Sequence, residues 1–148
     1  MQASCALYIA NLDRLGSGAT HSPLCGVVPE VSSKSDKSVY TYRWSDLTVV
    51  FSEMPTVNVP GHLTSFEQHI RGRFHRDSTP QWVEDLVSRI KSSSLVVGVV
   101  ASPDFDVEKR AEAIVGVICD KYKAMMFFAD HLYDWDGTVL FEPNGSRS

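Results

Sequence analysis

The sequence has few cysteines, and none of them are close enough together to form a common metal or redox motif. The three cysteines are Cys5, Cys25 and Cys119. No CxxC pair occurs, which argues against a zinc knuckle and against a thioredoxin-type centre. Cys119 lies in an apolar stretch with helical spacing, so we expect it to be a small buried hydrophobic residue. Because dispersed cysteines suit a reducing compartment, we expect a cytoplasmic protein.

The sequence also lacks a long hydrophobic run. The N-terminal apolar run covers only residues 5–10, and no lysine or arginine precedes Arg14. A signal peptide has a basic start and a longer apolar segment, and a membrane-spanning helix needs about 20 apolar residues. We therefore expect no signal peptide and no membrane association.

Positive charge is scarce relative to negative charge. The chain carries 14 lysine and arginine residues against 18 aspartate and glutamate residues, a formal net charge of −4. Nucleic-acid-binding domains usually have a basic balance, so nucleic acid is not an expected partner. Gly16-Ser17-Gly18 begins like a phosphate-binding loop, but the lysine and the helix of that motif do not follow it. We expect no cofactor.

The composition that remains is typical of one globular domain. Of the 148 residues, 43% are hydrophobic and 22% are charged, which are ordinary values for a domain that buries its own core. We assign residues 1–148 to a single domain. Residues 16–38 are rich in glycine, serine and proline and have no hydrophobic periodicity. This composition predicts a flexible loop within the domain.

Short apolar segments predict several strands. They alternate with polar residues or run continuously, and they cover residues 6–10, 39–44, 47–51, 95–101, 125–129 and 138–141. The valine-rich segment 95–101 has the pattern of a central strand buried on both faces. Phe127 in the following segment is expected to be largely buried.

Helical spacing predicts three helices between these strands. The first follows Thr64 and Glu67, which have the spacing of a capping box, and ends at Gly72. The second and third carry apolar stripes, and their members are Val83, Leu86, Val87, Ile90, Ala111, Ile114, Val115, Ile118 and Tyr122. Together with the strands, they predict an α+β fold. The expected architecture is a two-layer sandwich, with a mixed but mostly antiparallel sheet of five to six strands and about three helices packed on one face.

Residues 132–140 read Leu-Tyr-Asp-Trp-Asp-Gly-Thr-Val-Leu. This string resembles the first motif of the haloacid dehalogenase superfamily, in which an apolar strand runs into Asp-x-Asp-Gly-Thr. The resemblance implies that Asp134 attacks a phosphoryl group and that Asp136 is the acid/base, both beside magnesium. It covers nine residues, and only eight follow Leu140, too few for the later motifs of that superfamily. We favour the alternative, in which Asp136-Gly137 is a two-residue hairpin turn.

The same acidic loop contains the candidates for a metal or catalytic site. Asp130, Asp134 and Asp136 could together hold a cation, and His131 lies between them as a further catalytic candidate. His62 and His69 are seven residues apart and have no partner with metal-ligand spacing, so we expect surface or capping roles for them.

Arginines gather in one short segment. Arg71, Arg73 and Arg76 lie within six residues, with Phe74 between them. Such a cluster can bind an anion, whereas the alternative is a solvated helix end, where cations favour the helix dipole.

Two functions from different classes fit these patterns. The first is a small non-catalytic module that binds a protein partner or itself, and we expect a homodimer because strands at both ends leave open sheet edges. The second is a small metal-assisted hydrolase that uses Asp130, Asp134 and Asp136. We favour the first, since the sequence contains no complete catalytic motif.

Overall fold

A computed structural model of the chain describes residues 3–10, 30–34, 37–73, 80–102 and 110–142. The strands are β1 (Ala3–Ala10), β2 (Glu30–Lys34), β3 (Lys37–Arg43), β4 (Thr48–Glu53), β5 (Ser93–Ser102), β6 (Met125–Phe128), β7 (His131–Tyr133) and β8 (Val139–Phe141). The helices are the short 3₁₀ helix η1 (Thr56–Asn58) and the α-helices α2 (Val59–Arg71), α3 (Gln81–Lys91) and α4 (Arg110–Tyr122). The predicted α+β class is therefore confirmed.

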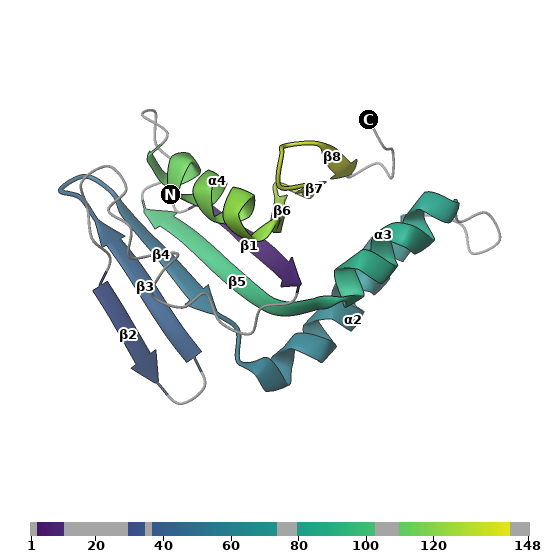
Figure 1. Ribbon diagram of the computed structural model, residues 1–148, viewed down its shortest axis with the longest axis horizontal. Coiled ribbons are helices and arrows are strands. Elements are labelled where there is room, and N and C mark those ends of the chain that lie inside the picture. The colour runs from purple at the N-terminus through teal and green to yellow at the C-terminus, as the bar shows by residue number, and fades with distance from the viewer. Residues whose placement is uncertain (1–2, 11–29, 35–36, 74–79, 103–109, 143–148) are drawn as a thin grey trace.

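All eight strands belong to one sheet, in the order β2-β3-β4-β5-β1-β6-β7-β8 (Figure 1). The N-terminal strand β1 lies near the middle of the sheet, between β5 and β6. It is antiparallel to both, with Ala3 opposite Ala101 in β5 and Tyr8 opposite Met125 in β6. Every pairing of neighbouring strands is antiparallel, so the prediction of a mixed sheet was wrong. The strands β5 and β6, which α4 connects, run in the same direction only because β1 separates them.

The three α-helices cover both faces of the sheet, so the prediction of a two-layer sandwich with helices on one face was wrong. Successive side chains of a strand point to opposite faces. In β1, Leu7 and Ile9 belong to the core beneath α4, whereas Tyr8 belongs to the core beneath α2 and α3. The apolar stripes of the helices cannot reveal this division, because each stripe shows only that a helix covers some surface.

The core on the α4 side combines the central strands with that helix. Its members include Leu7, Tyr42, Phe51, Val97 and Ile114, all of which are fully buried. The core on the other side contains the apolar faces of α2 and α3 together with side chains of β7 and β8. In Figure 1, α4 crosses in front of β5 and β1, while α2 and α3 lie side by side.

The sheet has more strands than the predicted five to six because two strands lack a readable pattern. The strand β2 (Glu30–Lys34) lies in the serine-rich segment predicted as a loop, and it pairs along its whole length with β3. The last two residues of that predicted loop belong to β3, and residues 16–29, 35 and 36 lie outside the described residues. The strand β7 has three residues and pairs with both β6 and β8.

Most of the predicted core is confirmed. The α3 stripe is buried, and so are Ile114, Val115, Ile118 and Cys119 of α4. Tyr122 is only half-buried, and the side chain of Ala111 lies outside the part that the structure describes. Phe127 is only half-buried. In β5, Gly98 is exposed, so this strand is not covered completely on both faces. The helix α2 begins at Val59, and Thr64 donates its hydroxyl hydrogen bond to the Pro60 carbonyl inside the helix, so the predicted capping box was wrong.

Candidate functional site

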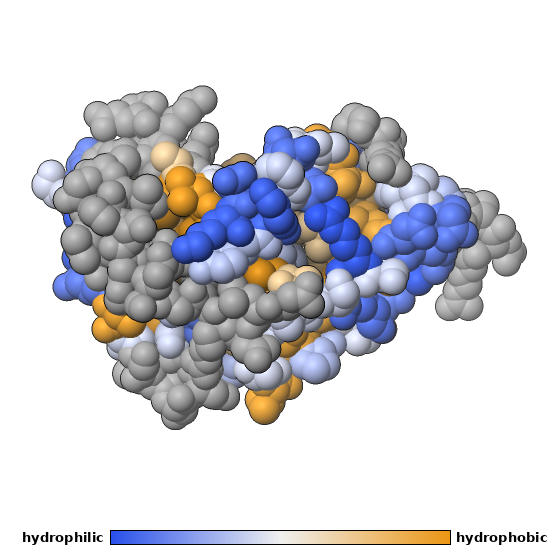
Figure 2. Space-filling model, in the orientation of Figure 1, coloured by the Kyte–Doolittle hydropathy of each residue, from blue (hydrophilic) through white to orange (hydrophobic). Residues whose placement is uncertain are grey.

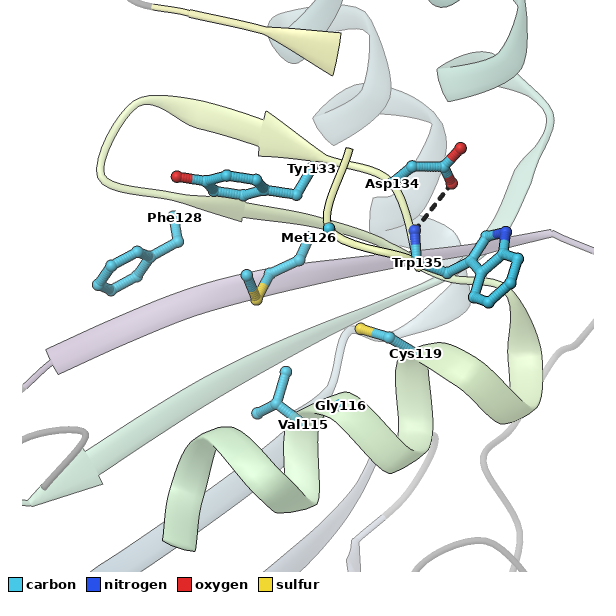
Figure 3. A pocket seen from close by; sticks show the side chains of 9 residues that line it. Val115, Gly116, Cys119, Met126, Phe128, Tyr133, Asp134 and Trp135 are labelled. Atoms are coloured by element: carbon cyan, nitrogen blue, oxygen red, sulfur yellow. Dashed lines mark hydrogen bonds between the residues drawn. The ribbon is translucent and has the colours of Figure 1, made fainter. Parts of the chain in front are cut away.

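A hollow lies on the α4 face of the sheet, between that helix and the β6–β7 hairpin. Its volume is about 400 Å³. Figure 3 shows side chains of α4 on one side of the hollow and side chains of the two strands on the other. We call it the apolar groove. Its volume lies within the range of roughly 300–1,000 Å³ that is common for small-ligand pockets.

The helix α4 supplies one wall of the apolar groove through Val115, Gly116 and Cys119. These residues lie on one side of the helix because i and i+4 are one turn apart. Val115 and Cys119 are almost fully buried. Gly116 is exposed, and a Cβ atom built on it would meet no atom within 4 Å. The groove therefore extends to the helix backbone at this position.

The β6–β7 hairpin supplies the opposite wall through Met126, Phe128 and Tyr133. Met126 pairs with Tyr133 across the hairpin, so their side chains share one face. Strand alternation sends Phe127 and Leu132 to the other face, where they pack against the α2 and α3 core. The three wall residues are only half-buried, because α4 does not extend over them.

The β7–β8 turn closes one end of the groove through Asp134, Trp135 and Gly137. The Trp135 side chain is 38% exposed, and Lys123 holds its ammonium 3.7 Å from the centre of the indole ring. Such a cation over an indole face stabilises the position of the ring. In Figure 2, hydrophobic surface lies over the β7 and β8 region beside the hydrophilic outer face of α4.

The carboxylate of Asp134 is paired. Arg89 of α3 donates hydrogen bonds from both terminal nitrogens to its two oxygens, the Nη1 contact being 3.0 Å, and the Trp135 backbone N–H donates to Oδ1 at 2.8 Å. The Arg89 hydrogen bonds lower the pKa of Asp134 below its ordinary value. The carboxylate is thus ionised at neutral pH, but its charge is balanced by the guanidinium.

The thiol in the groove is kept in its protonated form at neutral pH. Burial raises the pKa of Cys119 to about 12. The pKa of Cys5 in β1 is also raised to about 12, mainly by burial and to a smaller extent by the charge of the neighbouring Cys119. Because the thiolate is the nucleophilic form of cysteine, neither thiol is prepared for covalent catalysis.

The structure does not bring the predicted acidic candidates together. Asp130 lies in the β6–β7 turn, whereas Asp134 and Asp136 lie in the β7–β8 turn, at the other end of β7. Four residues of extended chain span roughly 13 Å, too far for one cation to bridge. Asp136 accepts a hydrogen bond from the Thr138 backbone N–H at 3.1 Å. In the described part of the chain, no group of three or more histidine, cysteine, aspartate or glutamate residues could hold a metal ion.

The remaining features of the acidic loop are those of turns. Gly137 has a φ of 90°, and its N–H donates to the Asp134 carbonyl at 3.0 Å. The turn is therefore centred on Trp135 and Asp136, one position before the predicted Asp136-Gly137 turn. His131 Nδ1 lies 2.9 Å from the Ala129 carbonyl oxygen, and its ring stacks on Tyr133.

The arginine cluster is not an open anion site at Arg71. This side chain donates hydrogen bonds to Glu67 at 2.7 Å and to Glu84 at 2.6 and 2.9 Å. Those carboxylates raise the pKa of Arg71, and the hydrogen bond to Glu84 has the larger effect. Arg73 also has an interaction within the chain, and Arg76 lies outside the described residues. Arg71 thus links α2 to α3.

The histidines of α2 belong to an aromatic cluster. His62 Nε2 lies 2.8 Å from the Tyr8 hydroxyl, and both rings stack near Phe66. His69 contacts Phe66 and Phe127. Burial lowers the pKa of His62. His69 is exposed, as predicted for a surface histidine, whereas His62 is half-buried and packs against Tyr8 and Phe66.

The groove residues were not among the predicted site residues, apart from Asp134. A sequence signal was present in residues 125–128, Met-Met-Phe-Phe. In a strand, such a run places two large side chains on each face. Where the helix on one face does not reach over the strand, the pair of side chains on that face lines a surface hollow.

No helix within the described ranges is long and apolar enough to cross a membrane. Comparison with known proteins found no matching family model, no matching curated protein and no matching solved structure.

Proposed function

We propose that this protein is a non-catalytic binding module and that the apolar groove receives an apolar side chain of a protein partner. The observation that carries the proposal is the groove itself, a hollow of about 400 Å³ with largely apolar walls. Exposed apolar hollows on a soluble domain are typical interaction sites. The partner is either another protein or a second copy of this chain.

The ionisable groups in the groove favour binding over catalysis. Asp134 is held by Arg89, and the raised pKa of Cys119, caused by burial, keeps that thiol protonated. Nucleophilic or acid–base catalysis needs a group that is free to attack or to exchange a proton. Neither of these two side chains offers one.

A substitution that fills the groove tests the proposal. Gly116→Leu places a side chain in the open space beside the helix backbone, and leucine is a better helix former than glycine. Gly61→Leu is the matched control, because Gly61 is also an exposed glycine in an α-helix, has the same open space around its Cβ position and does not line the groove.

Peptides selected from a random library against the wild-type protein should bind Gly61→Leu equally well and should lose binding to Gly116→Leu. A library that yields no peptide with this difference would contradict the proposal. Sedimentation velocity over a concentration series tests the homodimer. Self-association that Gly116→Leu abolishes would identify the partner as a second copy.

The alternative of a metal-assisted hydrolase has its own test. We expect no hydrolysis of an aryl phosphate by the wild-type protein with magnesium. Turnover that depends on magnesium and disappears in Asp134→Asn would replace the binding proposal with phosphoryl transfer.

A further inference from the structure

We propose that the occupant of the apolar groove is an uncharged aromatic side chain, presented by the partner protein. This inference rests on the proposed function and specifies the chemistry that the groove selects. It follows from three properties of the groove: its aromatic side chains, its charge and the open space at Gly116.

The walls present rings and a thioether. Phe128 and Tyr133 come from the hairpin, Trp135 from the following turn, and Met126 lies between them and α4 (Figure 3). Aromatic rings prefer offset or edge-to-face contacts with another ring. A methionine sulfur also makes favourable contacts with a ring edge. An aliphatic side chain would gain only the apolar contact, whereas a ring gains these directional contacts too.

The charges around the groove favour a neutral occupant. The carboxylate of Asp134 is balanced by Arg89, so it offers little attraction to a cation. The face of Trp135 carries the Lys123 ammonium at 3.7 Å, which would repel a second cation approaching that ring. The two cations beside the groove are already paired with carboxylates, Arg89 with Asp134 and Lys123 with Asp120 at 3.5 Å, so they offer little attraction to an anion. A neutral ring meets none of these costs.

The α4 wall of the groove has room for a flat group at Gly116. Gly116 leaves the backbone of α4 uncovered, with nothing within 4 Å of its Cβ position. A planar ring can lie against bare helix backbone, while a branched side chain would leave part of this space empty. The glycine is thus the position at which a side chain of this protein would compete most directly with the occupant.

The test uses two uncharged probes of the same backbone, N-acetyl-tryptophanamide and N-acetyl-leucinamide, in NMR titrations of the full chain. The tryptophan probe should shift amide signals of residues 115–119 and 126–135 in a saturable way. Its dissociation constant should be at least tenfold smaller than that of the leucine probe. Gly116→Leu should raise the dissociation constant of the tryptophan probe at least tenfold, and Gly61→Leu should leave that constant unchanged.

A second variant keeps the test decisive if Gly116→Leu does not fold. Phe128→Leu retains an apolar side chain but removes one ring. It should raise the dissociation constant of the tryptophan probe several-fold and leave that of the leucine probe unchanged. Equal binding of both probes to the wild type would overturn the aromatic preference while the proposed function stands. If neither probe binds, and no library peptide distinguishes Gly116→Leu, both proposals fail.

Discussion

Arg89 and Asp134 are 45 residues apart in sequence, yet the guanidinium of Arg89 donates two hydrogen bonds to the carboxylate of Asp134. The first residue lies on α3 and the second in the turn that carries Trp135. This ion pair therefore joins a helix on one face of the sheet to the turn that closes the apolar groove on the other face. The acidic residue that most resembles a nucleophile in sequence has a structural role.

Removing this pair should have a modest cost that depends on pH. Asp134→Asn retains an oxygen for the Trp135 N–H but loses the charge, so we expect a loss of about 1 kcal/mol at pH 7, the upper end for partly exposed pairs. The pKa of Asp134 is lowered in the folded state, chiefly by Arg89. Its contribution is therefore complete above the ordinary pKa of 3.8 and disappears as pH falls through the lowered value.

Urea melts at pH 7 and pH 5 should show the same difference between wild type and Asp134→Asn, and an NMR titration of the Asp134 carboxyl carbon should show its midpoint below 3.8. Arg89→Gln, alone and combined with Asp134→Asn, completes a double-mutant cycle. A cycle without coupling energy would show that the two side chains do not interact in solution.

The stability of the protein should fall between pH 7.5 and pH 5 in a way that depends on His62. Burial lowers the pKa of this imidazole in the folded state, so below its ordinary pKa of about 6.5 the unfolded chain takes up a proton that the folded chain resists. Stability is thus complete above that pKa and declines as pH falls toward the lowered one. His62→Gln should show a smaller decline in urea melts at the two pH values. An equal decline in both proteins would refute this assignment.

The β6–β7 turn should become more stable with a glycine. Ala129 has a φ of 52°, in the left-handed region, which costs a residue with a Cβ roughly 1–2 kcal/mol. Ala129→Gly should therefore raise the free energy of unfolding by about 1 kcal/mol, less the entropy that glycine adds to the unfolded chain. Thermal and urea melts measure the change, and a lower stability would contradict the backbone conformation of this turn.

The β7–β8 turn should respond in the opposite direction. Gly137 has a φ of 90° with open space around it, so an added methyl group meets no neighbour and only the backbone is strained. Gly137→Ala should destabilise the protein by about 1 kcal/mol or more. A neutral effect in the same melts would mean that Gly137 does not hold a positive φ in solution.

The core beneath α4 should be sensitive to a cavity. Ile114 is completely buried between α4 and the sheet, and Ile114→Ala should cost roughly 2–5 kcal/mol. Val117 on the same helix is 42% exposed, so Val117→Ala serves as the control and should change stability by less than about 1 kcal/mol. Equal effects of the two substitutions in urea melts would show that the helix is rotated.

Sequence periodicity was sufficient to predict the buried residues of those helices and strands that have a clear apolar pattern of their own. The stripe of Val83, Leu86, Val87 and Ile90 in α3 is buried as predicted, since local spacing alone determines which side of an element is apolar. Three of the four valines of β5 are buried as well, and Val100 is half-buried. The strand β2 failed this test because three of its five residues are Ser32, Ser33 and Lys34. It exists because β3 offers it a partner, which no local pattern can reveal.

The candidate site was less predictable than the fold for a related reason. Gly116 and Trp135 line one hollow, but nothing in their own neighbourhoods says that α4 and the β7–β8 turn meet. The acidic residues Asp130 and Asp136 are close in sequence, and the three residues of β7 between the two turns hold them apart. Proximity in sequence was therefore a poor guide to proximity in space.

The position of β1 in the sheet has a consequence for how the chain folds. β1 is made before β2, β3, β4, α2 and α3, but its partner β5 follows all of them, and Ala3 pairs with Ala101. Pairings of such long sequence separation close slowly, because the entropy of the intervening chain must be lost first. During synthesis, the apolar residues Leu7, Tyr8 and Ile9 therefore stay unpaired until β5 and β6 have been made. Exposed apolar residues of this kind favour aggregation. A nascent chain that has not yet emerged past Ser102 should depend on chaperones, and folding should proceed in one late step once β5 becomes available to β1.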